Sequence, residues 1–322
     1  MSLRDLIMLL IQSNLIYSIL TNLKLLYLGG VLRSSHLRVS DLWETDGTGV
    51  EAFRLTMSLK RFKFLLRCLR FDDIRDRTER EALDNLAAVR KMFDEFVARC
   101  KINYVVGYTV TIDEMLEGFR GRCGFRQYIK SNPARYGLKI LSMADSENYY
   151  TVNMEVYKQP DGLYVVDNSA FSVVKRLITL IALSGRNVTT DNWFSSIPLA
   201  SYLLEQKLTT IGTIRKNNKE LPEEFVVSKD HEQYSSLFGF QKNATIVSYV
   251  PKKGKVITLL STYHHTNEID EKTGEKYKPK IITFYNDTKC GVYKVDEMKG
   301  TYSVSRKSAR WSLTFPYLIL RE

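Results

Sequence analysis

The hydrophobic pattern changes its period near residue 104, and this change constrains the fold more than any other feature. Before it, stretches such as "EAFRLTMSLKRFKFLLRCLRF" place apolar residues at helical spacing. After it, "YTVTIDEML", "RYGLKILSMADS" and "YYTVNMEVYK" alternate as β-strands do, and helix-like and strand-like segments then follow in turn. Such a chain is expected to form an α/β fold, with helices covering the faces of a mixed sheet.

The same patterns divide the chain into four predicted parts. Residues 1–103 form an N-terminal helical domain, and residues 104–219 form the first part of the sheet-containing core. Residues 220–283 carry short alternating runs separated by "KKGK" and "KTGEKYKP", which predict a β-rich insertion. Residues 284–322 return to a helical pattern that is still running at the last residue, so we expect a truncated chain.

The charge balance and the cysteines limit the function classes. Lys and Arg total 47 against 36 acidic residues, and this net charge of +11 favours polyanionic partners such as nucleic acid, or an anionic membrane surface. The four cysteines are scattered without a C-x-x-C pair, which argues against a zinc module and a disulfide scaffold and suits a reducing compartment. No signal peptide and no apolar run of about eighteen residues is found, so we expect no membrane span.

Two aspartates occupy corresponding places in the predicted sheet. Asp113 lies in its first strand, and Asp191 ends its fourth, in "VTTDNWF". If these strands are neighbours, two carboxylates meet at one edge, where they repel unless a cation such as Mg²⁺ lies between them. Such a site can serve phosphoryl transfer on nucleic acid. The alternative is that Asp113 pairs with a nearby arginine and Asp191 caps the following helix.

Longer motifs extend this interpretation. The stretches that carry them are "TIDEMLEGFRGRCGFRQYIKSNPARYGLKI", "DNWFSSIPLASYLLEQKLTTIGTIRKNNKELP", "YNDTKCGVYKVDEMKGTYSVSRKSARW" and, upstream of them, "MSLKRFKFLLRCLRFDD". In this order and spacing they resemble the conserved blocks of the piggyBac family of transposases. The resemblance runs from about residue 5 to the end, with a minor departure at Asn132, where the family pattern has a lysine.

The resemblance implies a retroviral-integrase-like RNase H fold and metal-dependent DNA strand cleavage and transfer in the nucleus, with Mg²⁺ or Mn²⁺ held by three aspartates. Asp113 and Asp191 match the first two. The third position falls on Tyr293, which is neutral near pH 7 and a poor ligand for Mg²⁺. Asp296, about one helical turn further on, is the remaining candidate for the third ligand. We therefore expect impaired catalysis.

The resemblance also implies contacts with DNA. It places basic side chains in segments that approach the nucleic acid, although a solvated basic face is the alternative. These residues are Lys130, Arg135, Lys139, Arg215, Lys216, Lys219, Arg306, Lys307 and Arg310. A homodimer is expected on the same ground, whereas the family's C-terminal zinc module has no counterpart after Cys290. Two other functional hypotheses stay open: a domesticated DNA-binding protein without catalysis, and a truncated copy with no selected function.

Overall fold

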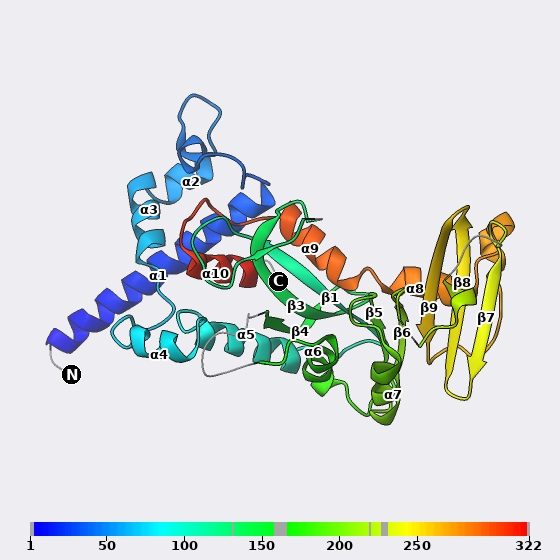
Figure 1. Cartoon of the computed structure of the whole chain (residues 1–322). Helices are drawn as coiled ribbons and strands as arrows, with labels where there is room; N and C mark the ends of the chain where they lie inside the picture. The colour runs from blue at the N-terminus through cyan, green and yellow to red at the C-terminus, as the bar shows by residue number, and fades with distance from the viewer. Residues whose placement is uncertain (1–2, 131, 158–165, 219, 227–230, 321–322) are drawn as a thin grey trace. The chain divides into compact units, whose positions relative to one another are not determined.

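The computed structural model spans the whole chain (Figure 1). It describes all residues except 1–2, 131, 158–165, 219, 227–230 and 321–322, and it describes the side chains from residue 16 onward. The chain divides into two compact units, each assembled from separate stretches. The first comprises Met1–Glu95, Phe119–Gly124 and Glu297–Glu322, and the second comprises Phe96–Gly118 and Phe125–Asp296. The four predicted parts differ from these units in their boundaries and stay predictions.

The first unit is helical. Its helices are α1 (Leu3–Val31), η1 (Val39–Trp43), α2 (Glu51–Thr56), α3 (Leu59–Cys68), α4 (Arg77–Leu83), η5 (Trp311–Leu313) and α10 (Thr314–Ile319), and α5 (Arg90–Ile102) crosses into the second unit. Trp43 packs its ring against Phe53 and Phe62, with centroids 5.0 and 4.9 Å apart. Leu26 and Tyr317 join the same buried cluster, so residues from both ends of the chain form one core.

The second unit is built on a mixed sheet. Its strands are β1 (Thr109–Gly118), β2 (Gln127–Tyr128), β3 (Tyr136–Asp145), β4 (Thr151–Val156), β5 (Asn187–Thr190), β6 (Thr209–Thr213), β7 (Ser236–Gln241), β8 (Ala244–Lys252) and β9 (Lys255–Ser261). Over the described residues they lie in the order β2-β3-β1-β5-β6-β9-β8-β7, and β4 also pairs with β3. β1, β5 and β6 are parallel, and the other pairs are antiparallel.

The segment predicted as a β-rich insertion continues this sheet. β9 pairs with β6 through Ile211 and Ser261, and β8 and β7 follow it outward (Figure 1). Ile211 belongs to the same buried cluster as Val247 and Leu259 of the added strands. The hairpins therefore share a core with the parallel strands.

Helices cover both faces of the sheet. The remaining elements are α6 (Ala170–Leu177), η2 (Ile178–Leu180), α7 (Ile197–Glu205), η3 (Glu223–Phe225), η4 (Glu271–Lys276), α8 (Lys280–Thr288) and α9 (Gly291–Thr301), the last of which crosses into the first unit. Ile112 of β1 lies in one buried cluster with Val173 of α6 and Leu203 of α7. Its neighbour Thr111 donates a hydrogen bond to the carbonyl of Thr288 in α8. Because successive strand residues face opposite sides, α8 lies on the face away from α6 and α7.

The structure confirms the predicted mixed α/β sheet with flanking helices and a helical N-terminal region. Across the described residues, none of the helices combines the length and the hydropathy that a membrane span requires.

Candidate metal centre at the end of two parallel strands

The parallel ladder between β1 and β5 brings the two predicted aspartates together. Its last partners are Ile112 and Thr190, and β5 ends there while β1 continues to Gly118. Asp113 directly follows Ile112 on β1, and Asp191 directly follows Thr190 at the end of β5, so the two aspartates lie beside one another at the end of the ladder. The two strands are neighbours, so the condition on which the predicted pair of carboxylates depended is met.

Asp191 is held by the turn that follows its strand. Its Oδ1 accepts the backbone N–H groups of Trp193 at 2.8 Å and Phe194 at 3.3 Å. Its carbonyl accepts from the N–H and the hydroxyl of Ser195, at 3.0 and 2.8 Å. Helix α7 is capped instead by Ser196, whose hydroxyl accepts from the N–H of Leu199. Asp191 therefore orders a tight turn and does not cap the helix, so that alternative is not what the structure shows.

Asp113 carries a strongly perturbed carboxyl group. Its pKa is raised to about 7, chiefly by burial and also by the negative charges of Asp191 and Glu114, while the backbone N–H of Glu114 and the charge of Lys139 act to lower it. Its Oδ1 accepts the backbone N–H of Glu114 at 2.8 Å. The cation that acts on Asp113 is thus a lysine and not the arginine of the alternative hypothesis. The two aspartates repel one another at a shielded position, as expected where a cation is to be bound.

Glu114 adds a third carboxylate that the sequence did not predict. One oxygen from each of Asp113, Glu114 and Asp191 lies within 4.8 Å of the other two. The Oε1 atom of Glu114 is 3.8 Å from the Nζ of Lys139, and burial raises the pKa of this carboxyl while Lys139 lowers it. Strand alternation assigns neighbouring residues to opposite faces, which hid Glu114. The sequence did contain a signal for Glu114, because Asp113 and Glu114 are adjacent acidic residues just beyond the point where β5 stops pairing with β1.

This donor set suits a hard divalent cation. Three carboxylates supply only oxygen ligands, which Mg²⁺ and Mn²⁺ prefer. The Oε2 atom of Glu114 is buried and has no hydrogen-bond partner, and an unsatisfied buried oxygen of this kind is costly unless something binds it. Among the described residues, these three form the one acidic group with such close oxygens. The residues present therefore fit a metal ion.

The structure does not bring Asp296 into this group. Asp296 is half-buried on α9, and it is absent from the carboxylates that converge within 4.8 Å in the described part of the chain. Tyr293 lies on the same helix with 62% of its surface exposed. The third ligand predicted from the sequence is thus not among the residues that meet at the end of β5.

The basic residues expected near the site occupy different environments. Lys130, Arg135 and Lys216 are exposed, and Lys219 lies outside the described residues. Arg215 is exposed too, and its Nε donates to the carbonyl of Asn192, the residue after Asp191, at 3.1 Å. Lys139 is different, because only 15% of its side chain is exposed and its Nζ lies over the ring of Trp193 at 4.8 Å.

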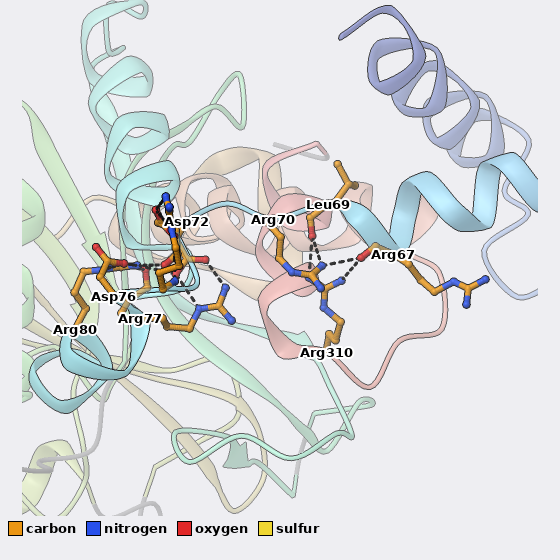
Figure 2. A network of polar contacts seen from close by, with 11 residues as sticks. Arg67, Leu69, Arg70, Asp72, Asp76, Arg77, Arg80 and Arg310 are labelled. Atoms are coloured by element: carbon orange, nitrogen blue, oxygen red, sulfur yellow. Dashed lines mark hydrogen bonds and ion pairs between the residues drawn. The ribbon is translucent and has the colours of Figure 1, made fainter. Parts of the chain in front are cut away.

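Two of the three basic residues expected in the C-terminal segment form bonds inside the helical unit. Arg306 is buried and donates to the carbonyl and the hydroxyl of Ser34, at 2.8 and 3.1 Å. Arg310 donates to the carbonyls of Arg67 at 3.3 Å and Leu69 at 2.9 Å, and Figure 2 shows Arg70 converging on the same two carbonyls. Lys307 is exposed. The burial of Arg306 suits a structural role, and its contact with DNA stays a prediction.

Comparisons with known proteins give a consistent result. A family model described as "Transposase IS4" matches residues 19–321. The human "PiggyBac transposable element-derived protein 3" is 23% identical over 253 residues, which cover 74% of this chain and 42% of the relative. The human "Chimeric ERCC6-PGBD3 protein" is 23% identical over the same share of this chain and 24% of its own length. The chain thus spans less than half of either human relative.

A solved structure is similar over nearly the whole chain. It is described as the "Cryo-EM structure of piggyBac transposase synaptic complex with hairpin DNA (SNHP)", and it aligns with a TM-score of 0.87 and 39% identity. The alignment covers 94% of this chain and 63% of the other. This likeness, together with the mixed sheet, confirms the RNase H-like fold expected from the sequence.

Proposed function

Because this chain belongs to the piggyBac family of transposases, we propose that it carries the catalytic core of an enzyme that cuts DNA strands and transfers their ends. The single observation that carries this proposal is the convergence of Asp113 and Asp191 at the end of the β1–β5 ladder, next to a third carboxylate. The whole reaction would be cut-and-paste transposition in the nucleus. A homodimer is proposed on the family resemblance alone.

In this proposal Asp113 and Asp191 hold Mg²⁺ or Mn²⁺. The sequence motifs named Asp296 as the third ligand, but among the described residues Asp296 is not one of the carboxylates that converge with these two. When bound, the ion supplies Lewis-acid polarisation of a backbone phosphate and a hydroxide-like nucleophile near neutral pH. Asp191 is suited to a fixed role, because its turn already uses Oδ1 and orients the carboxylate. Hydrolysis breaks the bond between phosphorus and the 3′-oxygen and leaves a 3′-hydroxyl, which then attacks the opposite strand and later the target DNA.

DNA is proposed to lie along the exposed basic residues near this site. Arg215 supports this path, since its bond to Asn192 places a guanidinium next to the turn that holds Asp191. Lys130, Arg135 and Lys216 are exposed, so their charged groups are accessible to phosphates. The family resemblance adds Lys139, Lys219, Arg306, Lys307 and Arg310 to the proposed contacts, although Lys139 and Arg306 are largely buried and Lys219 lies outside the described residues. Such contacts are sequence-independent and dependent on salt.

One observation favours a second candidate function, a domesticated protein that binds DNA without cutting it. Tyr293 occupies the position at which the family resemblance expects a catalytic aspartate, and a neutral phenol cannot replace that carboxylate. We propose slow cleavage as the main function, because the other two aspartates and a neighbouring glutamate still converge.

The test is a nicking assay on supercoiled plasmid, which needs no knowledge of the natural DNA ends. The unmodified chain is expected to convert plasmid to nicked circles slowly with Mn²⁺ and not with EDTA. Asp191→Asn, which keeps a side-chain oxygen for the turn, should abolish nicking and leave DNA binding intact. Binding with no nicking above that of Asp191→Asn would support the second candidate and overturn the first. Absence of both nicking and DNA binding would exclude both.

A further inference from the structure

Glu114 is the one member of the carboxylate group to which the sequence motifs assigned no role, although it follows Asp113 directly in the D-E pair. From its geometry we propose that Glu114 is a metal ligand in this chain and supplies the carboxylate that position 293 lacks. This inference rests on the proposed function, because it assumes that the ion bound by Asp113 and Asp191 exists. It concerns only which third residue binds that ion.

The bonding of Glu114 leaves one oxygen for the ion. Its backbone pairs with Leu141 of β3, which fixes the position of the residue on the strand. Its Oε1 lies 3.8 Å from the Nζ of Lys139, which is longer than a charge-assisted hydrogen bond of about 2.7–2.9 Å. Its Oε2 is buried with no partner. One oxygen of this carboxylate is thus held only weakly, and the other has no hydrogen-bond partner. Because two other carboxylates lie nearby, the group is suited to bind a cation.

Lys139 lies beside the carboxylate of Glu114. The Nζ of Lys139 is held over the rings of Trp193 at 4.8 Å and Tyr157 at 5.2 Å, and its side chain is largely buried. Trp193 belongs to the turn that Asp191 orders through its Oδ1. The lysine therefore links Glu114 of β1 to the Asp191 turn, and it restrains the glutamate near the two aspartates. We assign Lys139 a positioning role for Glu114.

The α9 helix offers no equivalent ligand in this arrangement. Tyr293 has no carboxylate and 62% of it faces solvent. Asp296 is not within the 4.8 Å group that includes Glu114. A third carboxylate from β1 restores the number of ligands that the family resemblance implies, and it comes from a rigid strand.

The inference is tested by measuring Mn²⁺ affinity in the whole chain without DNA, through the electron paramagnetic resonance signal of free Mn²⁺. Glu114→Gln keeps the shape of the side chain and removes its charge, so it should weaken Mn²⁺ binding about tenfold or more, the range for residues that support a metal. Glu114→Asp should retain part of the affinity. The matched control is Glu275→Gln, an exposed residue of η4, which should bind as the unmodified chain does.

Asp113→Asn and Asp296→Asn separate the possible outcomes. Asp113→Asn should abolish binding, whereas Asp296→Asn should leave it within about twofold. If Asp113→Asn weakens binding and Glu114→Gln does not, the inference is wrong and the proposed function stands. If the unmodified chain binds no Mn²⁺, or if Asp113→Asn has no effect, the proposed metal site itself is excluded. Circular dichroism and the unfolding temperature of each metal-free variant show whether a lost affinity comes from lost folding.

Discussion

Asp191 lies one residue beyond Thr190, the last partner of the parallel β1–β5 ladder, and Asp113 lies one residue beyond Ile112, its partner on β1. The pairing of two residues thus places the next two carboxylates side by side. The turn after β5 fixes Asp191 through two backbone N–H groups, and burial keeps the pKa of Asp113 near 7. The site combines a rigid carboxylate with a second one whose charge is unfavourable without a cation.

The raised pKa of Asp113 predicts a pH-dependent instability of the metal-free protein. Between about 3.8, the usual value, and about 7, the folded state binds more protons than the unfolded state, so stability falls as pH rises through this window. Asp113→Asn removes the titrating group. In EDTA, the free energy of unfolding of Asp113→Asn should therefore exceed that of the unmodified chain by an amount that grows between pH 4 and pH 7. Above pH 7 this difference should stay constant at about 2 kcal/mol, roughly half of the free energy that corresponds to the full pKa shift.

Chemical unfolding at pH 4.5, 6 and 8 checks this prediction. Glu275→Gln serves as the control, because it removes an exposed carboxylate and should follow the unmodified chain at every pH. An advantage of Asp113→Asn that shrinks as pH rises would contradict the assignment of a buried, repelled carboxyl group.

The sequence predicted those features that depend on local periodicity and strand register. The change from helical to alternating spacing located the sheet. The "TTD" at the end of one strand and the "TID" within another located Asp191 and Asp113. Glu114 was missed because the alternation rule does not describe a long side chain at a place where the neighbouring strand has ended. The burial of Arg306 depends on Ser34, which is 272 positions away in the chain, and no local pattern reports such a contact.

The exposed lysines proposed to contact DNA should contribute separately to its affinity. Replacing Lys130 and Lys216 together by alanine removes two phosphate contacts, so the slope of log affinity against log salt should become less negative by about 2. Replacing Lys252 and Lys253, in the turn between β8 and β9, removes the same charge from a part of the sheet remote in strand order from Asp113. Fluorescence anisotropy with one labelled duplex at several salt concentrations measures both slopes. Equal changes in the two double variants would show that net charge and not this surface determines binding.

His264 should make the second unit less stable in weak acid. Its pKa is lowered to about 4, chiefly by burial and also by the charge of His265. Its Nδ1 lies 3.0 Å from the hydroxyl oxygen of Ser261. Between about pH 6.5 and pH 4, the imidazole of His264 is protonated in the unfolded state and neutral in the folded state. The free energy of unfolding therefore falls as pH falls through this window. His264→Gln should remove a loss on the order of 1 kcal/mol between pH 7 and pH 4.5, because partial exposure reduces the full effect. His36→Gln, at an exposed position, should retain the loss in the same unfolding experiment.

The nicking rate should respond to a carboxylate at position 293. Tyr293 is exposed on α9, so Tyr293→Asp should change the folding stability by no more than about 0.5 kcal/mol. If this position faces the bound ion, as the family resemblance implies, the new carboxylate adds a ligand, and plasmid nicking with Mn²⁺ should rise on the order of tenfold. Tyr293→Phe removes the hydroxyl without adding charge and should nick at the original rate. A Tyr293→Asp rate equal to that of Tyr293→Phe would mean that α9 does not reach the ion, and that the site must work with the carboxylates of β1 and the Asp191 turn alone.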